Sequence, residues 1–231
     1  MTVRPSADLP AAFARLGGQE DGRVWGELWD DLCHQGCVYD DSFHALPYLV
    51  AIATGRAPGA PLDAVLMAGL IVSAADEERT ARYADGIAAL LPVARRLLDA
   101  ATDDAPAFVY LLQCVLAFEG ERVWSAGRLE GLFEQEYELE CPACTSELFL
   151  AFGDPGAFAL DAGRAPADPA GAALIPADPA ALAPLPARLH RTATRAGHEA
   201  VARGLTHLFG RAVCPFCETA FTVSDEVGKS P

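Results

Sequence analysis

The chain has 231 residues, of which 52% are hydrophobic and 21% charged, and its formal net charge is −15 at pH 7. This balance excludes a disordered chain, and so much negative charge repels phosphate backbones, which makes nucleic acid a poor candidate partner. No apolar run reaches the ~18 residues of a membrane span and no secretory signal is visible, so we expect a cytoplasmic protein without a membrane partner.

Helical periodicity dominates the first 135 residues. Val24, Leu28 and Leu32 recur at steps of four, and residues 61–77 are apolar nearly all round, which predicts a buried helix that begins at Pro61. Further apolar stripes over residues 80–104, 105–120 and 122–135 predict additional helices. We therefore expect a helical domain over residues 1–135.

A weak internal repeat is visible in this domain. Pro47 and Pro92 lie in similar apolar stretches 45 residues apart, a spacing typical of HEAT or armadillo repeats. Each proline is expected to kink its helix. An irregular helical bundle is the alternative interpretation.

One stretch of this domain, residues 29–53, has a pattern of the form W-x-x-L-x-H-Q-G-x-V-Y followed by an apolar P-x-L. The matching residues are Trp29, Leu32, His34, Gln35, Gly36, Val38, Tyr39, Ala45, Leu46, Pro47 and Leu49. The stretch resembles a group of bacterial HEAT-like repeat proteins, most of them uncharacterised, although Cys37 stands where the pattern has a hydroxyl residue. The resemblance implies a short α-solenoid with a binding role and no reaction.

The remaining residues, 136–231, have a different texture. Alternating, aromatic-rich segments surround two cysteine pairs and predict two β-hairpins. Between them we expect a Pro/Ala-rich crossing over residues 164–187 and a helical insertion over residues 188–210, which is broken at Gly197. The predicted second domain is a zinc ribbon that this insertion splits.

The cysteine pairs carry the strongest chemical signal. The motifs C-P-A-C at residues 141–144 and C-P-F-C at residues 214–217 are separated by 69 residues. Two C-x-x-C turns supply the four thiolates of a tetrahedral Zn²⁺ site with Zn–S distances of ~2.3 Å. We therefore predict one structural Zn²⁺ with the ligands Cys141, Cys144, Cys214 and Cys217.

Two observations leave alternatives open. Zinc ribbons usually have glycine after the second cysteine, where this chain has Thr145 and Glu218. The C-P-F-C motif also resembles the active site of glutaredoxins, but only 14 residues follow Cys217, too few for that fold. A zinc–thiol switch that loses its metal on oxidation remains an alternative.

The C-H-Q-G-C segment at residues 33–37 is the other candidate site. We interpret Cys33 as a small core residue, and assign a partner-binding role to His34, Gln35 and Tyr39 because loop residues often carry function. No phosphate loop and no known catalytic motif is present. The sequence thus favours a mainly α, zinc-stabilised module that binds a protein partner, with an enzyme of unrecognised site as the alternative.

Overall fold

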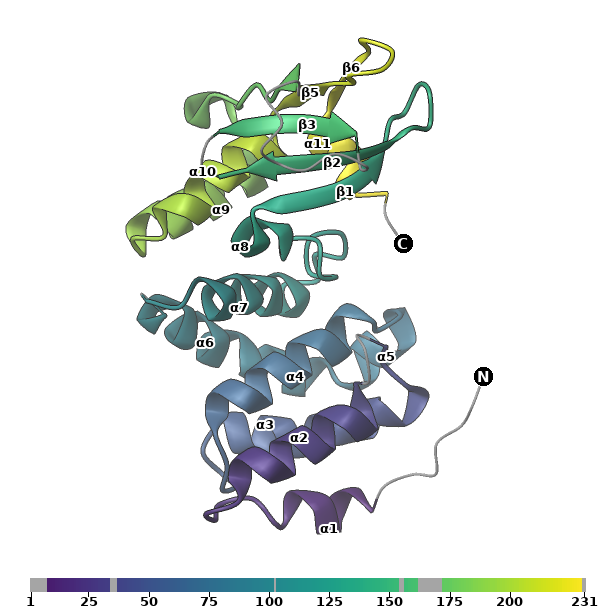
Figure 1. Ribbon diagram of the computed structural model, residues 1–231. Coiled ribbons are helices and arrows are strands. Elements are labelled where there is room, and N and C mark those ends of the chain that lie inside the picture. The colour runs from purple at the N-terminus through teal and green to yellow at the C-terminus, as the bar shows by residue number, and fades with distance from the viewer. Residues whose placement is uncertain (1–7, 34–36, 102, 154–155, 162–171, 230–231) are drawn as a thin grey trace. The chain divides into compact units, whose positions relative to one another are not determined.

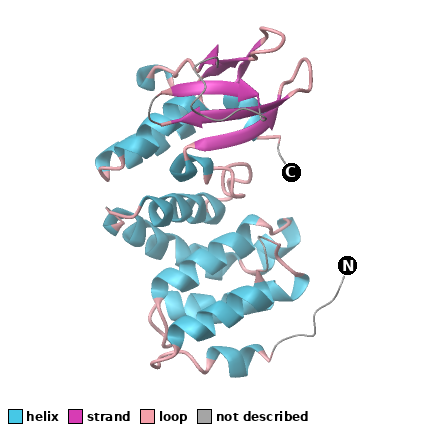
Figure 2. Ribbon diagram, in the orientation of Figure 1, coloured by secondary structure: helices cyan, strands magenta, loops and turns pink. Residues whose placement is uncertain are grey.

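The computed structural model describes residues 8–33, 37–101, 103–153, 156–161 and 172–229 (Figure 1). Helices make up most of the described chain, and the strands form small antiparallel sheets (Figure 2). The mainly α fold class is therefore confirmed.

The chain forms two compact units. The first contains Met1–Ala100 and Tyr110–Gly127, and the second contains Ala101–Val109 and Arg128–Pro231. The sequence placed the division after residue 135. Helix α7 (Ala105–Phe118) contributes its first residues to the second unit and the others to the first.

The described part of the first unit is helical. Besides the later residues of α7, its helices are α1 (Leu9–Phe13), α2 (Asp21–Leu32), η2 (Asp40–Ala45), α3 (Leu46–Ala53), α4 (Pro61–Ser73), α5 (Glu77–Arg82) and α6 (Ala84–Ala100). Helix α4 begins at Pro61 and is buried along most of its length, as its apolar sequence predicted. At Gly69, α4 approaches α7 so closely that a Cβ atom would lie 2.3 Å from the sulfur of Cys114.

Two expectations for the first domain are wrong in detail. Pro47 lies in the first turn of α3, where it removes no hydrogen bond, so only Pro92 is inside a helix. Residues 122–130 form turns, and only the short helix α8 (Gly131–Glu134) follows. At the start of this segment the Glu121 carboxylate accepts hydrogen bonds from the backbone N–H groups of Val123 at 3.1 Å and Trp124 at 2.6 Å.

The second unit is built around two antiparallel sheets. The larger has the order β1-β2-β3-β4 and the smaller pairs β5 with β6. Its strands are β1 (Glu136–Glu140), β2 (Glu147–Phe152), β3 (Ala157–Asp161), β4 (Ala172–Ala173), β5 (Arg211–Val213) and β6 (Ala220–Thr222). An isolated bridge between Ile175 and Arg211 links the end of the larger sheet to β5.

The helical insertion supports the larger sheet. It consists of α9 (Pro184–Arg195) and α10 (Glu199–Leu208), and Gly197 between them has a φ of +83°. The residue order predicted this break because glycine reaches positive φ without strain. On α10, the ring of His207 lies 6.2 Å from that of Phe152 on β2, so α10 packs on the buried face of the sheet.

Two elements of this unit differ from the sequence interpretation. Helix α9 begins inside the expected Pro/Ala-rich crossing, because Pro184 occupies its first turn. The 3-10 helix η3 (Pro179–Ala181) precedes it. After the second hairpin the chain forms a short helix, α11 (Val223–Val227), which the sequence interpretation did not contain. The backbone oxygen of Val227 accepts a hydrogen bond from Arg128 at 3.2 Å.

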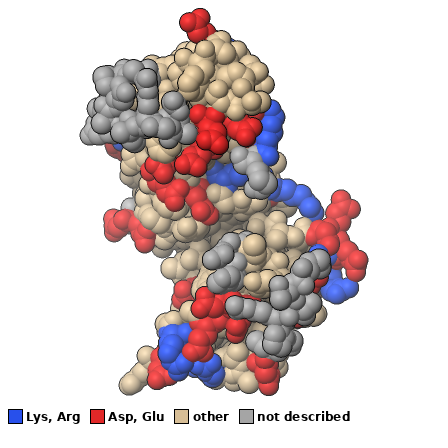
Figure 3. All heavy atoms as spheres, turned by 45° about the vertical axis from the view of Figure 1, so that its right-hand side comes forward, with Lys and Arg blue, Asp and Glu red and all other residues tan. Residues whose placement is uncertain are grey.

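The surface reflects the net charge. Asp and Glu side chains are spread over both units on the face that Figure 3 shows. Among the described residues, no helix combines the length and the apolar character needed to cross a membrane.

Candidate metal centre

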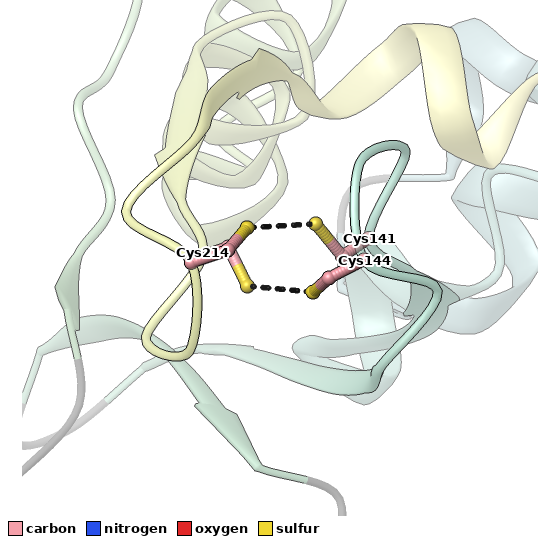
Figure 4. Close-up of side chains that lie close together, drawn as sticks. Cys141, Cys144 and Cys214 are labelled. Carbon is pink, nitrogen blue, oxygen red and sulfur yellow. Dashed lines mark hydrogen bonds between the residues drawn. The ribbon is translucent and has the colours of Figure 1, made fainter.

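The two cysteine motifs form the turns of the two β-hairpins, and the second unit brings these turns together. The C-P-A-C motif connects β1 with β2, and the C-P-F-C motif connects β5 with β6. The four sulfur atoms all lie within 4.8 Å of one another. Figure 4 shows the two pairs facing each other from opposite hairpins.

Two of the six sulfur–sulfur distances match the edges of one tetrahedral ion. The Sγ atoms of Cys141 and Cys217 are 3.7 Å apart, and those of Cys144 and Cys214 are also 3.7 Å apart. A tetrahedral ion with Zn–S bonds of ~2.3 Å requires sulfur–sulfur edges of about 3.8 Å. The four thiols are thus close enough together to surround one metal ion.

Backbone hydrogen bonds shape the first turn. The N–H of Cys141 donates to the carbonyl of Ser146 at 2.9 Å, and the N–H of Thr145 donates back to the carbonyl of Cys141 at 3.0 Å. The N–H of Ala143 points at the sulfur of Cys141 at 3.5 Å. A sulfur–oxygen distance of 3.3 Å joins Cys144 to the Ser146 hydroxyl.

The second turn repeats each of these contacts. The N–H of Cys214 donates to the carbonyl of Thr219 at 2.9 Å, and the N–H of Glu218 donates to the carbonyl of Cys214 at 3.0 Å. The N–H of Phe216 lies 3.4 Å from the sulfur of Cys214, and Cys217 lies 3.3 Å from the Thr219 hydroxyl. Two turns 70 positions apart thus have one geometry.

The residue after each second cysteine has a left-handed backbone. Thr145 has a φ of 57° and Glu218 a φ of 59°. Glycine adopts this conformation at the lowest cost, which explains its usual presence there in zinc ribbons. The turn geometry is retained here with non-glycine residues.

Burial and hydrogen bonding divide the thiols into an inner and an outer pair. Cys141 and Cys214 are 1% and 0% exposed, whereas Cys144 is partly exposed and Cys217 exposed. Burial raises the pKa of Cys214 to about 11. The neighbouring Ser146, through its hydroxyl and its backbone, lowers the pKa of Cys144 to about 6.

The outer thiol of the second hairpin behaves in the same way. The hydroxyl and backbone of Thr219 lower the pKa of Cys217. A lowered thiol pKa favours the thiolate, which is the form that binds metal. Ser146 and Thr219 were not among the predicted site residues, although a hydroxyl residue two positions after the second cysteine is common to both motifs.

The described cysteines of the C-H-Q-G-C segment are not members of this cluster. Cys33 is buried at the end of α2, and burial raises its thiol pKa to about 12, while Cys37 is exposed. Tyr39 is partly exposed and its N–H donates to the Ser42 hydroxyl at 3.1 Å. His34 and Gln35 lie outside the described residues.

Comparisons of the chain with protein-family models, with curated proteins and with solved structures find no match.

Proposed function

We propose that Cys141, Cys144, Cys214 and Cys217 bind one structural Zn²⁺ and that the protein is a zinc-stabilised module for binding a protein partner. The 3.7 Å spacing of the sulfurs carries the metal proposal. Four thiolates are soft ligands in the number that structural zinc requires. They also fill the coordination shell, so no position is left for a reacting water.

The role of the ion follows from the elements it would join. One pair of ligands lies in the larger sheet and the other in the β5-β6 hairpin, and α9 and α10 lie between them in sequence. An ion bound by all four sulfurs would hold the two hairpins together as a split zinc ribbon. Binding of structural zinc contributes on the order of 10 kcal/mol to a small domain.

The interaction role rests on the first unit. Its helices form a packed array in which α3 lies against both α4 and α6, consistent with the HEAT-like pairing that the sequence resemblance implies. Residues 1–100 and 110–127, which form this unit, carry 16 acidic and 9 basic side chains. A protein partner with a basic surface would match this charge, because complementary charges accelerate association.

Metal analysis of untagged protein tests the zinc proposal. We expect about one zinc per chain and no stoichiometric iron, which four thiolates could also bind. Cys141→Ser and Cys214→Ser should each lower zinc content and expose residues 164–187 to protease. Cys37→Ser is the matched control, because Cys37 is exposed and outside the centre, and it should retain full zinc.

In the same experiment, tryptophan fluorescence reports on the first unit alone. All three tryptophans, Trp25, Trp29 and Trp124, belong to the first unit. Removal of zinc with a strong chelator should therefore loosen the second unit and leave the tryptophan signal unchanged. If Cys214→Ser retained all its zinc, the split site would be wrong.

The interaction role is tested by affinity capture from the native cell with the intact chain and with Cys214→Ser. A stoichiometric protein that the intact chain retains at moderate salt supports the proposal. Recovery of nucleic acid with a steep salt dependence, or of no stoichiometric protein, would contradict it.

A further inference from the structure

Access to solvent is graded across the four sulfurs. Cys217 is exposed and Cys144 partly exposed, whereas Cys141 and Cys214 are buried. Each hairpin thus contributes one outer and one inner thiol. Because a peroxide must reach the sulfur that attacks it, Cys217 is the first site of oxidation for an oxidant that arrives from solvent.

Two sulfur–sulfur contacts of 3.7 Å connect different hairpins. Cys144 lies 3.7 Å from Cys214 (Figure 4). Cys217 lies 3.7 Å from Cys141. Each contact joins an outer sulfur to an inner one. A disulfide requires a sulfur–sulfur distance of about 2.05 Å, so a closure of less than about 2 Å would complete either bond.

From this arrangement we infer that the four-cysteine centre is an oxidation site for hydroperoxides, and that its products are the two disulfides Cys141–Cys217 and Cys144–Cys214. The inference rests on the zinc site proposed above as the starting state. It differs from oxidation within each C-x-x-C motif, which would leave the two hairpins unconnected.

The chemistry balances with hydrogen peroxide as the oxidant. The Cys217 thiolate attacks one peroxide oxygen, the O–O bond breaks, and Cys217 sulfenic acid and hydroxide form. The Cys141 thiolate then attacks the sulfenic sulfur and expels a second hydroxide as the disulfide forms. Cys144 and Cys214 consume a second peroxide in the same way, and the ion leaves because its thiolate ligands are used up.

The consequence is that oxidation replaces a metal link by a covalent one. The disulfides join positions 76 and 70 residues apart, so they close long loops and restrict the unfolded chain. The larger sheet and the β5-β6 hairpin would remain connected after zinc is lost. The oxidised unit should therefore resist a chelator that loosens the reduced unit.

Peptide mapping of the zinc-loaded full chain tests this inference. Cleavage after arginine and lysine gives one peptide with the first motif, residues 129–164, and one with the second motif, residues 212–229. After treatment with two equivalents of hydrogen peroxide per zinc, non-reducing mass spectrometry should find these peptides linked. Fragmentation before Pro142 and Pro215, which follow the first cysteine of each motif, assigns the pairing.

A chromogenic indicator should record release of zinc in the same sample, and a dithiol reductant should restore zinc binding. Cys37→Ser removes the exposed thiol outside the centre and should leave the peroxide stoichiometry unchanged. Two unlinked peptides, each with an internal disulfide, would overturn the inference, and so would zinc retained in excess peroxide. Zinc content is measured before oxidation, so that a protein without bound zinc is distinguished from one whose zinc site does not form the predicted disulfides.

Discussion

Two residues of the metal centre have a left-handed backbone conformation that is unfavourable for any residue except glycine. Thr145 and Glu218 adopt φ values near 60°, which cost a residue with a side chain about 1–2 kcal/mol relative to the right-handed region. Their strain is balanced by the hydrogen bonds that close each turn. The sequence located both positions but could not show that the turn keeps its geometry without glycine.

Replacement of Glu218 by glycine should stabilise the zinc-loaded second unit. Relief of about 1–2 kcal/mol is offset by about 0.4–1 kcal/mol of added entropy in the unfolded chain, which leaves a net gain on the order of 0.5–1 kcal/mol. Thr145→Gly should gain less, because the Thr145 hydroxyl donates to the carbonyl of Cys144 at 2.8 Å. Denaturant-induced release of zinc to a colorimetric chelator measures both.

Ala143→Gly is the control for Thr145→Gly, because Ala143 lies in the same turn as Thr145 without a positive φ and should lose stability. Equal effects of glycine at Ala143 and Thr145 would show that backbone strain is absent from this turn.

At the scale of elements, local patterns predicted most of the helices and both hairpins. The apolar runs of α4 and α7 and the alternation in β1 and β2 are encoded in neighbouring residues. The meeting of the two hairpins followed from ligand chemistry, since four thiols separated in sequence suit one ion.

Other elements depend on contacts that a sequence pattern does not contain. Residues 122–130 form turns where periodicity predicted a helix, and the Glu121 carboxylate accepts two backbone hydrogen bonds there. Segment 101–109 joins the second unit, where the ring of His198 lies 4.1 Å from that of Phe108 and its Nε2 lies 2.7 Å from the carbonyl oxygen of Ala101. These contacts connect residues that are 90 or more positions apart, so a local sequence pattern cannot predict them.

Two helical glycines should respond oppositely to alanine. In α4, Gly69→Ala places a methyl group against Cys114 of α7, and such overpacking costs about 1–3 kcal/mol, more than the gain of about 1 kcal/mol in helix propensity. In α2, Gly26 has open space around it, so Gly26→Ala should gain up to about 1 kcal/mol. Denaturation followed by tryptophan fluorescence measures both in the first unit. A stabilising Gly69→Ala would show that α4 and α7 are not in close contact there.

For the molecule as a whole, the division into two units predicts two separable unfolding events. Phe108 and Leu111 are both buried and lie one turn apart on α7, but they belong to different units. Phe108→Ala should weaken the second unit by about 3–5 kcal/mol and accelerate release of zinc to a chelator. Leu111→Ala should instead lower the free energy of unfolding of the first unit, followed by tryptophan fluorescence, by about 2–5 kcal/mol.

A single transition, shifted equally by both variants in zinc release and in fluorescence, would contradict this division. It would mean that α7 couples the units into one cooperative structure.

The long separation of the two cysteine motifs also constrains the order of folding. Each hairpin forms from neighbouring residues within about 1–10 µs, but the two must find each other across 70 positions, and the entropy of closing such a loop has to be overcome first. Before they meet, each hairpin offers an incoming ion only half of its ligands. The proposed zinc should therefore be captured late on the folding pathway, after α9 and α10 have brought the hairpins together, and its availability should then govern the last step of maturation rather than the first.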